Sequence, residues 1–141
     1  MLILINIMST FKQEESRQGA GAWVILSVRY GGDIRDPSLQ QLQQALGELF
    51  EENIPGMTEA DYMEHPNTWL RYGFDEGPEY VLDVYRDRSV IFAKYADQDD
   101  ADPLWEYRMN DVSREKALAL WQHLIEGKLD DLEAEGWEAS I

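Results

Sequence analysis

The segment "YVLDVYRDRSVIFAKY", residues 80–95, decides the fold class. Residues of high strand propensity stand on both sides of a polar centre, which predicts two antiparallel strands joined by a tight turn. We place a two-residue turn at Asp87–Arg88, so that residue 84 faces residue 91. Because Asp-Arg lacks the usual turn glycine, a looser turn is the alternative. In the two-residue register the side chains that face the core are Tyr80, Leu82, Val84, Ile91, Ala93 and Tyr95. The opposite, mixed face holds Val81, Asp83, Tyr85, Val90, Phe92 and Lys94.

Amphipathic helices are expected on both sides of this central hairpin. Leucines at helical spacing predict a first helix that Asp36 caps, with Pro37 as its first residue and a stop at residues 54–56. A second helix is expected between a cap at Ser113 and a stop at Gly127. Shorter helical pieces are expected within residues 57–66 and 128–137, and further strands at residues 22–30, 68–74 and 104–109.

The resulting element order, β-α-β-β-β-β-α-α, predicts an α+β fold. We expect an antiparallel sheet of about five strands with helices packed on one face. Residues 22–141 are predicted to form this single domain, behind a mobile leader at residues 1–21. Met1 and Met8 are the two candidate translation starts, and the polar stretch after Met8 favours the second. Of the five tryptophans, four are expected in the core and the fifth is expected to be exposed or docked back: Trp23, Trp69, Trp105 and Trp121, then Trp137.

The chain is strongly acidic, and the acidity is uneven. Its 28 acidic and 12 basic side chains give a formal net charge of −16 over 141 residues. Residues 97–141 hold 13 acidic and 4 basic side chains, a net of −9. Such a charge disfavours nucleic acid and anionic membranes as direct partners and favours basic proteins, although solubility alone is the simpler explanation. The absence of cysteine suits a cytoplasmic location.

The acidic stretch opens with "ADQDDADPLW", residues 96–105, between two predicted strands. A calcium-binding EF-hand loop needs an oxygen ligand at position 5, glycine at position 6 and glutamate at position 12. Counted from Asp97, these positions hold Ala101, Asp102 and Arg108, so the EF-hand pattern is absent. A solvated loop, a partner-binding edge and a weaker cation site of another type remain as interpretations.

No catalytic or cofactor motif is recognisable in the sequence. There is no glycine-rich phosphate loop and no nucleophile elbow. His65 and His123 are the only histidines, and neither has further metal ligands at a diagnostic spacing. We therefore expect no catalytic, cofactor or metal site, and we rank a small-molecule or metal-dependent enzyme below a binding protein.

A protein-binding role is the leading hypothesis, and a structural or regulatory domain that acts through self-association, for example as a homodimer, is the second. Acidic side chains would attract a basic partner and exposed aromatic side chains would anchor it. The candidate partner-binding residues are Asp97, Asp99, Asp100, Asp102, Glu106, Tyr85, Phe92 and Trp137.

In size, acidity, lack of cysteine and a strand-rich middle followed by helices, the chain resembles small acidic bacterial toxin-immunity proteins. The resemblance covers the outline of the whole chain and includes no diagnostic motif, so it assigns no functional residue. It implies a cytoplasmic, non-enzymatic protein that neutralises a basic toxin, such as a nuclease, by binding it.

Overall fold

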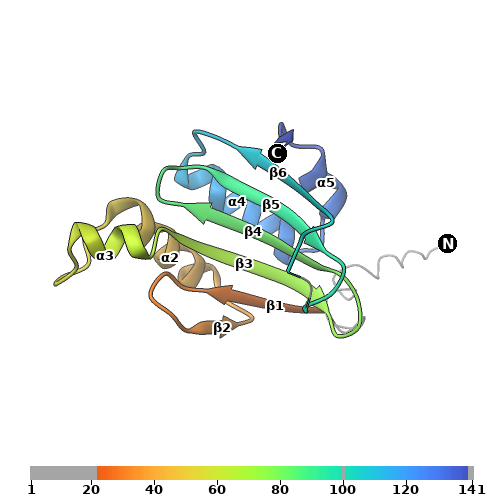
Figure 1. The fold of residues 1–141 in the computed structure, drawn as a ribbon, viewed down its shortest axis with the longest axis horizontal. Coiled ribbons are helices and arrows are strands. Elements are labelled where there is room, and N and C mark those ends of the chain that lie inside the picture. The colour runs from red at the N-terminus through yellow and green to blue at the C-terminus, as the bar shows by residue number, and fades with distance from the viewer. Residues whose placement is uncertain (1–21, 100, 140–141) are drawn as a thin grey trace.

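The computed structural model describes residues 22–99 and 101–139. The expected leader at residues 1–21, including the choice between Met1 and Met8, lies outside these residues, as does Asp100. The described chain forms one antiparallel sheet in the order β2-β1-β3-β4-β5-β6-β7 (Figure 1). The strands are β1 Ala22–Ser27, β2 Asp33–Arg35, β3 Asn67–Phe74, β4 Glu79–Tyr85, β5 Val90–Tyr95, β6 Trp105–Met109 and β7 Glu138–Ala139. The helices are α2 Leu39–Glu51, α3 Glu59–Glu64, α4 Arg114–Ile125 and α5 Leu129–Glu133.

The α+β class is confirmed, with seven strands in place of the expected five. The two additional strands, β2 and β7, have three and two residues and lie at the two edges of the sheet. Segments this short carry no readable alternation of polar and apolar residues, so only pairing with a neighbouring strand defines them. The five strands between these edges correspond to the segments expected from sequence.

Helices cover one face of the sheet and leave the other face open (Figure 1). α2 packs on β3, α4 packs on β3 and β4, and α5 packs on α4. Trp121 of α4 is fully buried, and its indole N–H donates to the backbone oxygen of Leu82 at 3.1 Å. α3 projects where β3 begins, beyond the end of the sheet. Among the described residues, no helix combines the length and the apolar character needed to cross a membrane.

The register predicted for the central hairpin is wrong by one residue. Val84 pairs with Val90 and Leu82 pairs with Phe92, so the turn contains three residues, 86–88. The amide of Arg88 donates to the Tyr85 oxygen at 2.9 Å, and Arg88 itself is left-handed, with φ at 71°. This is the common three-residue hairpin loop, in which the last residue is left-handed. It corresponds to the looser turn that was the alternative because the sequence lacks a turn glycine.

This shift exchanges the two faces of β5. Phe92, expected on the mixed face, is fully buried beneath the helices. Tyr95, expected in the core, pairs with Glu79 and points to the open face of the sheet. A shift of one residue has this effect because successive side chains of a strand point to opposite faces.

Helix α2 begins two residues later than its sequence motif predicted. Ser38 is the N-cap, and it forms a reciprocal capping box with Gln41. Asp36 is left-handed, with φ at 52°, and its amide donates to Val24 of β1 at 2.9 Å. The predicted cap of α4 is confirmed, since the Ser113 side chain accepts from the Lys116 amide.

A buried arginine joins the C-terminal ends of two helices to the turn after β1. Arg29 is 4% exposed, and its guanidinium pairs with Glu52 at 2.8 Å. Glu52 also pairs with Arg86 from the β4–β5 turn at 2.6 Å, and these two guanidinium groups lower the pKa of Glu52 to about 2. The backbone oxygens that accept from the Arg29 guanidinium belong to Glu48, Leu49, Tyr62 and His65.

Candidate functional site

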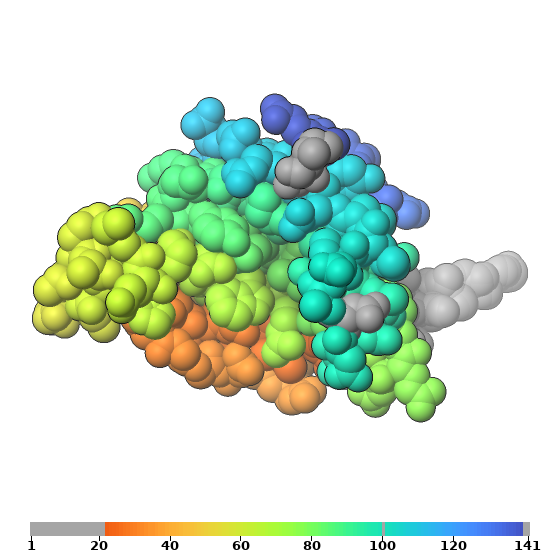
Figure 2. Space-filling view, viewed as in Figure 1, coloured from red at the N-terminus to blue at the C-terminus, as the bar shows by residue number. Residues whose placement is uncertain are grey.

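The uncovered sheet face combines aromatic, acidic and small apolar side chains. The strand registers place Trp69, Asp83 and Ile91 on this face, directly across from one another on β3, β4 and β5. Figure 2 shows this face, with the loop after β5 standing in front of the sheet on one side and α3 on the other. The open face is therefore bordered by the acidic loop identified in the sequence.

Two tryptophans expected in the core belong to the open face. Trp23 is only 8% exposed, because its ring lies flat over Gly73, where an added Cβ would come within 2.6 Å of the ring. Trp69 is partly exposed and faces a cavity. The other two, Trp105 and Trp121, do pack with the helix-covered core.

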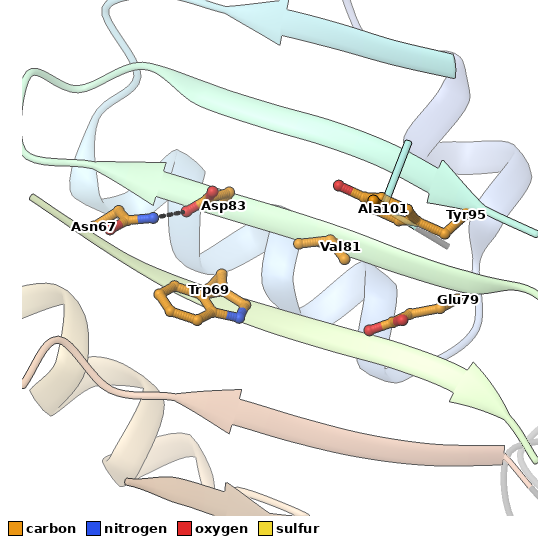
Figure 3. A pocket seen from close by; sticks show the side chains of 7 residues that line it. All are labelled: Asn67, Trp69, Glu79, Val81, Asp83, Tyr95 and Ala101. Carbon is orange, nitrogen blue, oxygen red and sulfur yellow. Dashed lines mark hydrogen bonds between the residues drawn. The ribbon is translucent and has the colours of Figure 1, made fainter. Parts of the chain in front are cut away.

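A cavity of about 340 Å³ opens on this face (Figure 3). This volume is at the lower end of the range for small-molecule binding sites. Asp83 and Asn67 lie at one end, where Trp69 forms an aromatic wall beside Asp83. Glu79 and Tyr95 lie at the other end, and Val81 lies between the two ends. The complete lining is Asn67, Trp69, Glu79, Val81, Asp83, Tyr95 and Ala101.

Asp83 is the main polar group at its end of the cavity. Asn67 donates to one carboxylate oxygen at 2.7 Å, and the Tyr85 hydroxyl donates to the other at 3.0 Å. Burial raises the pKa of Asp83 to about 6, because desolvation outweighs these two hydrogen bonds. Within the described part of the chain, Asp83 forms no ion pair. Each oxygen accepts one hydrogen bond and retains capacity for another.

Glu79, at the opposite end, is only 6% exposed and is partly neutralised. Its carboxylate lies 3.5 Å from the Arg71 guanidinium, which also approaches Asp33 at 3.7 Å. Burial raises the pKa of Glu79, and the Arg71 charge opposes that rise. Because one guanidinium serves both acids at long distances, the charge of the cavity remains negative.

The Tyr95 hydroxyl is surrounded by acidic groups. Burial raises the pKa of Tyr95, and four carboxylates raise it further by stabilising the neutral phenol. Three belong to the sheet, and the fourth is Asp102 of the acidic loop. The four carboxylates, in order of effect, are Glu106, Glu79, Asp83 and Asp102.

The acidic loop forms one wall of the cavity and exposes its own side chains. Ala101 lines the cavity, while Asp97, Asp99 and Asp102 are exposed to solvent. The Asp99 amide donates to Asp97 at 2.8 Å, which gives this part of the loop a local turn. Among the described residues, no group of three or more His, Asp or Glu side chains lies close enough to hold a metal ion.

The predicted partner-binding residues divide between the two faces. Tyr85 and Glu106 lie on the open face near the cavity. Phe92 is fully buried and cannot contact a partner in this fold, a consequence of the misplaced register. Trp137 docks back onto the covered side, with its ring 5.4 Å from Phe92 and its N–H donating to Leu132 at 2.6 Å.

Sequence reasoning missed the residues that form the cavity itself. One available signal was Asp83, an acidic residue within the otherwise apolar strand "YVLDVY". Asn67, Trp69 and Glu79 carried no comparable signal, because their convergence depends on the pairing of β3 with β4. Both histidines lie outside the cavity; the His65 ring packs against Tyr30 with 5.0 Å between centroids.

Comparison with known proteins does not extend this description, since no family model, curated protein or solved structure matches the chain.

Proposed function

We propose that this chain is a non-enzymatic binding protein that receives a basic segment of a partner protein on its open sheet face. One observation carries the proposal: the partly buried carboxylate of Asp83 has no counter-ion among the described residues, and it lies in a cavity lined by aromatic side chains and bordered by an acidic loop. A buried charge without an ion pair is costly, and an incoming cation would remove that cost.

The charge of the whole chain supports the same kind of partner. A net charge of −16 accelerates encounter with a basic protein at low ionic strength. The exposed acids of the loop stand beside the cavity, so they would contact the partner around the anchored segment. Affinity would come mainly from the buried site, while the exposed acids would contribute orientation and association rate.

A basic toxin is the partner class that we propose, in line with the resemblance to bacterial immunity proteins. Binding on the open face would neutralise such a toxin by covering its basic active site or substrate groove. In this role the chain would act in the cytoplasm, as a complex of one immunity protein with one toxin.

The test compares two triple variants that remove the same charge from different places. The first changes the loop: Asp97→Asn, Asp99→Asn and Asp102→Asn. The matched control changes α5: Asp130→Asn, Asp131→Asn and Glu133→Gln. A partner is captured from the native host, purified, and titrated by calorimetry with each variant. We expect the loop variant to weaken binding about tenfold or more, which corresponds to about 1.4 kcal/mol, and the control to have a small effect.

Equal losses in the two variants would show that only net charge matters, and this would contradict a defined acidic interface. Failure to capture any specific partner would also contradict the proposal.

Self-association is the second candidate, because the open face presents Trp69, Val81 and Ile91 without a covering element. Light scattering that gave a stable dimer, lost on Trp69→Glu, would favour it.

A further inference from the structure

We propose that the cavity between Asp83 and Glu79 is a recognition pocket for one arginine side chain of the partner. This inference rests on the proposed function and specifies what the open face recognises. The pocket has an acid at each end, and the Trp69 ring forms an aromatic wall beside Asp83 (Figure 3). The Asp83 end complements a flat cation, which would contact the Trp69 wall with its face and the Asp83 carboxylate with its edge.

The Asp83 end is the part of the pocket that lacks a cation. Glu79 already has Arg71 at 3.5 Å, whereas Asp83 accepts, within the described chain, only from the neutral Asn67 and Tyr85. One acceptor position remains on each Asp83 oxygen. A guanidinium group can donate two parallel hydrogen bonds to such a carboxylate, and the charged donors make these bonds stronger than neutral ones.

The aromatic wall favours arginine over lysine. Trp69 lines the pocket beside Asp83, and Tyr95 lines it beside Glu79. A guanidinium is planar and weakly hydrated, so it stacks on aromatic rings at a lower desolvation cost than an ammonium group. A lysine would bring one compact charge and would leave the flat wall less well covered.

The chain contains the same arrangement twice within its own fold. The Arg29 guanidinium lies 4.8 Å from the centroid of the Tyr62 ring and pairs with Glu52 at 2.8 Å. On the open face, the Arg71 guanidinium lies 5.7 Å from the Trp23 ring and pairs with Glu79. The Asp83–Trp69 pair offers a third aromatic-acid site, and among the described residues no cation of the chain pairs with Asp83.

The experiment titrates the full chain with three small probes and follows the amide and indole N–H signals by NMR. The probes are N-acetyl-arginine amide, N-acetyl-lysine amide and N-acetyl-citrulline amide, the last being a neutral isostere of arginine. We expect the arginine probe to shift the Trp69 indole and Asn67 side-chain signals with a Kd of about 1 mM, or about 4 kcal/mol of binding free energy. The lysine probe should bind several-fold more weakly, and the citrulline probe should cause no saturable shift.

Variants locate the binding within the pocket. Asp83→Asn preserves shape and removes the charge, so the arginine Kd should rise about tenfold. Trp69→Leu should also weaken binding, whereas Asp130→Asn, which removes one charge from α5, should leave it unchanged. The NMR spectrum of each variant reports whether the fold is retained.

Equal shifts with arginine and citrulline, or an unchanged affinity in Asp83→Asn, would overturn the arginine pocket. The proposed function can fail separately. Partner binding that depends on the acidic loop, together with no response to the arginine probe, would retain the function and remove the pocket. Specific arginine binding in a chain that captures no protein partner would remove the function and retain the pocket as an arginine site.

Discussion

At the scale of single residues, Asp83 is a carboxylate that does not stabilise the fold in its charged form. Among residues 22–99 and 101–139 the carboxylate has two neutral donors and no cation, and partial burial disfavours its charged form in the folded chain. A group that weakens the fold in its charged state but would bind a cation is typical of a functional site. The charged or titratable side chains that share its face nearby are Arg71, Glu79, Tyr85, Tyr95, Glu106 and Arg108.

The pKa of Asp83 leads to a defined pH dependence of stability. The pKa is about 6 in the folded chain and 3.8 in the reference state, so between these values the folded state binds more protons than the unfolded state. At pH 7 the charge of Asp83 lowers the free energy of unfolding by about 2–3 kcal/mol. This cost disappears as pH falls from about 6 to 4, so the chain becomes more stable over that range.

We expect Asp83→Asn to stabilise the chain at pH 7 by up to that amount and to have little effect at pH 4. Urea unfolding of the wild type and of Asp83→Asn at several pH values measures the difference, and Asp130→Asn serves as the control. A difference in unfolding free energy that stays constant from pH 4 to pH 7 would show that Asp83 titrates normally.

At the scale of elements, the buried Arg29 connects α2, α3 and the turn after β1. Its guanidinium donates to backbone oxygens at the C-terminal ends of both helices, where the last carbonyl groups have few partners within the helix. It also holds Glu52, through which the β4–β5 turn joins the same cluster. One side chain thus fixes the position of two helices relative to the sheet.

We expect Arg29→Met to destabilise the fold by about 3–5 kcal/mol, because it leaves helix carbonyls and the Glu52 charge without their buried partner. Glu52→Gln should cost less, about 1–2 kcal/mol, since Glu52 is partly exposed and solvent screens its charge. The pKa of Glu52 is lowered to about 2, so its stabilising contribution is present above pH 4.5 and is lost as pH falls towards 2. Chemical unfolding at pH 7 measures both variants, and equal small losses would contradict this ranking.

At the scale of the whole molecule, the net charge of −16 opposes compactness. Salt screens exposed charges that are separated by more than about 8–10 Å at physiological ionic strength. We therefore expect the melting temperature to rise between 50 mM and 500 mM NaCl. Relief of about 1 kcal/mol of repulsion would raise it by roughly 3–5 °C in a domain of this size.

Calorimetric scans of the wild type and of the α5 triple variant check this expectation. The variant carries three fewer negative charges, so its melting temperature should depend less on salt. A wild-type melting temperature that falls with NaCl would indicate that favourable ion pairs, such as Arg86 with Glu52, outweigh the repulsion.

The sequence by itself determined the α+β class, the central strands, the cap of α4 and the acidic character of the last third. These features follow from local propensity, capping chemistry and composition, all of which act within a few residues. Only the tertiary structure decided the register of the hairpin, because the turn Arg86-Asp87-Arg88 has no glycine that would select its length. A change of one residue in that turn exchanges the two faces of β5, and burial on the helix-covered face, against Trp105 and Trp137, selects Phe92 over Ile91 for the core. The cavity depends on that choice, since Tyr95 reaches the open face beside Glu79 only in the three-residue register, and the acidic loop then becomes its wall.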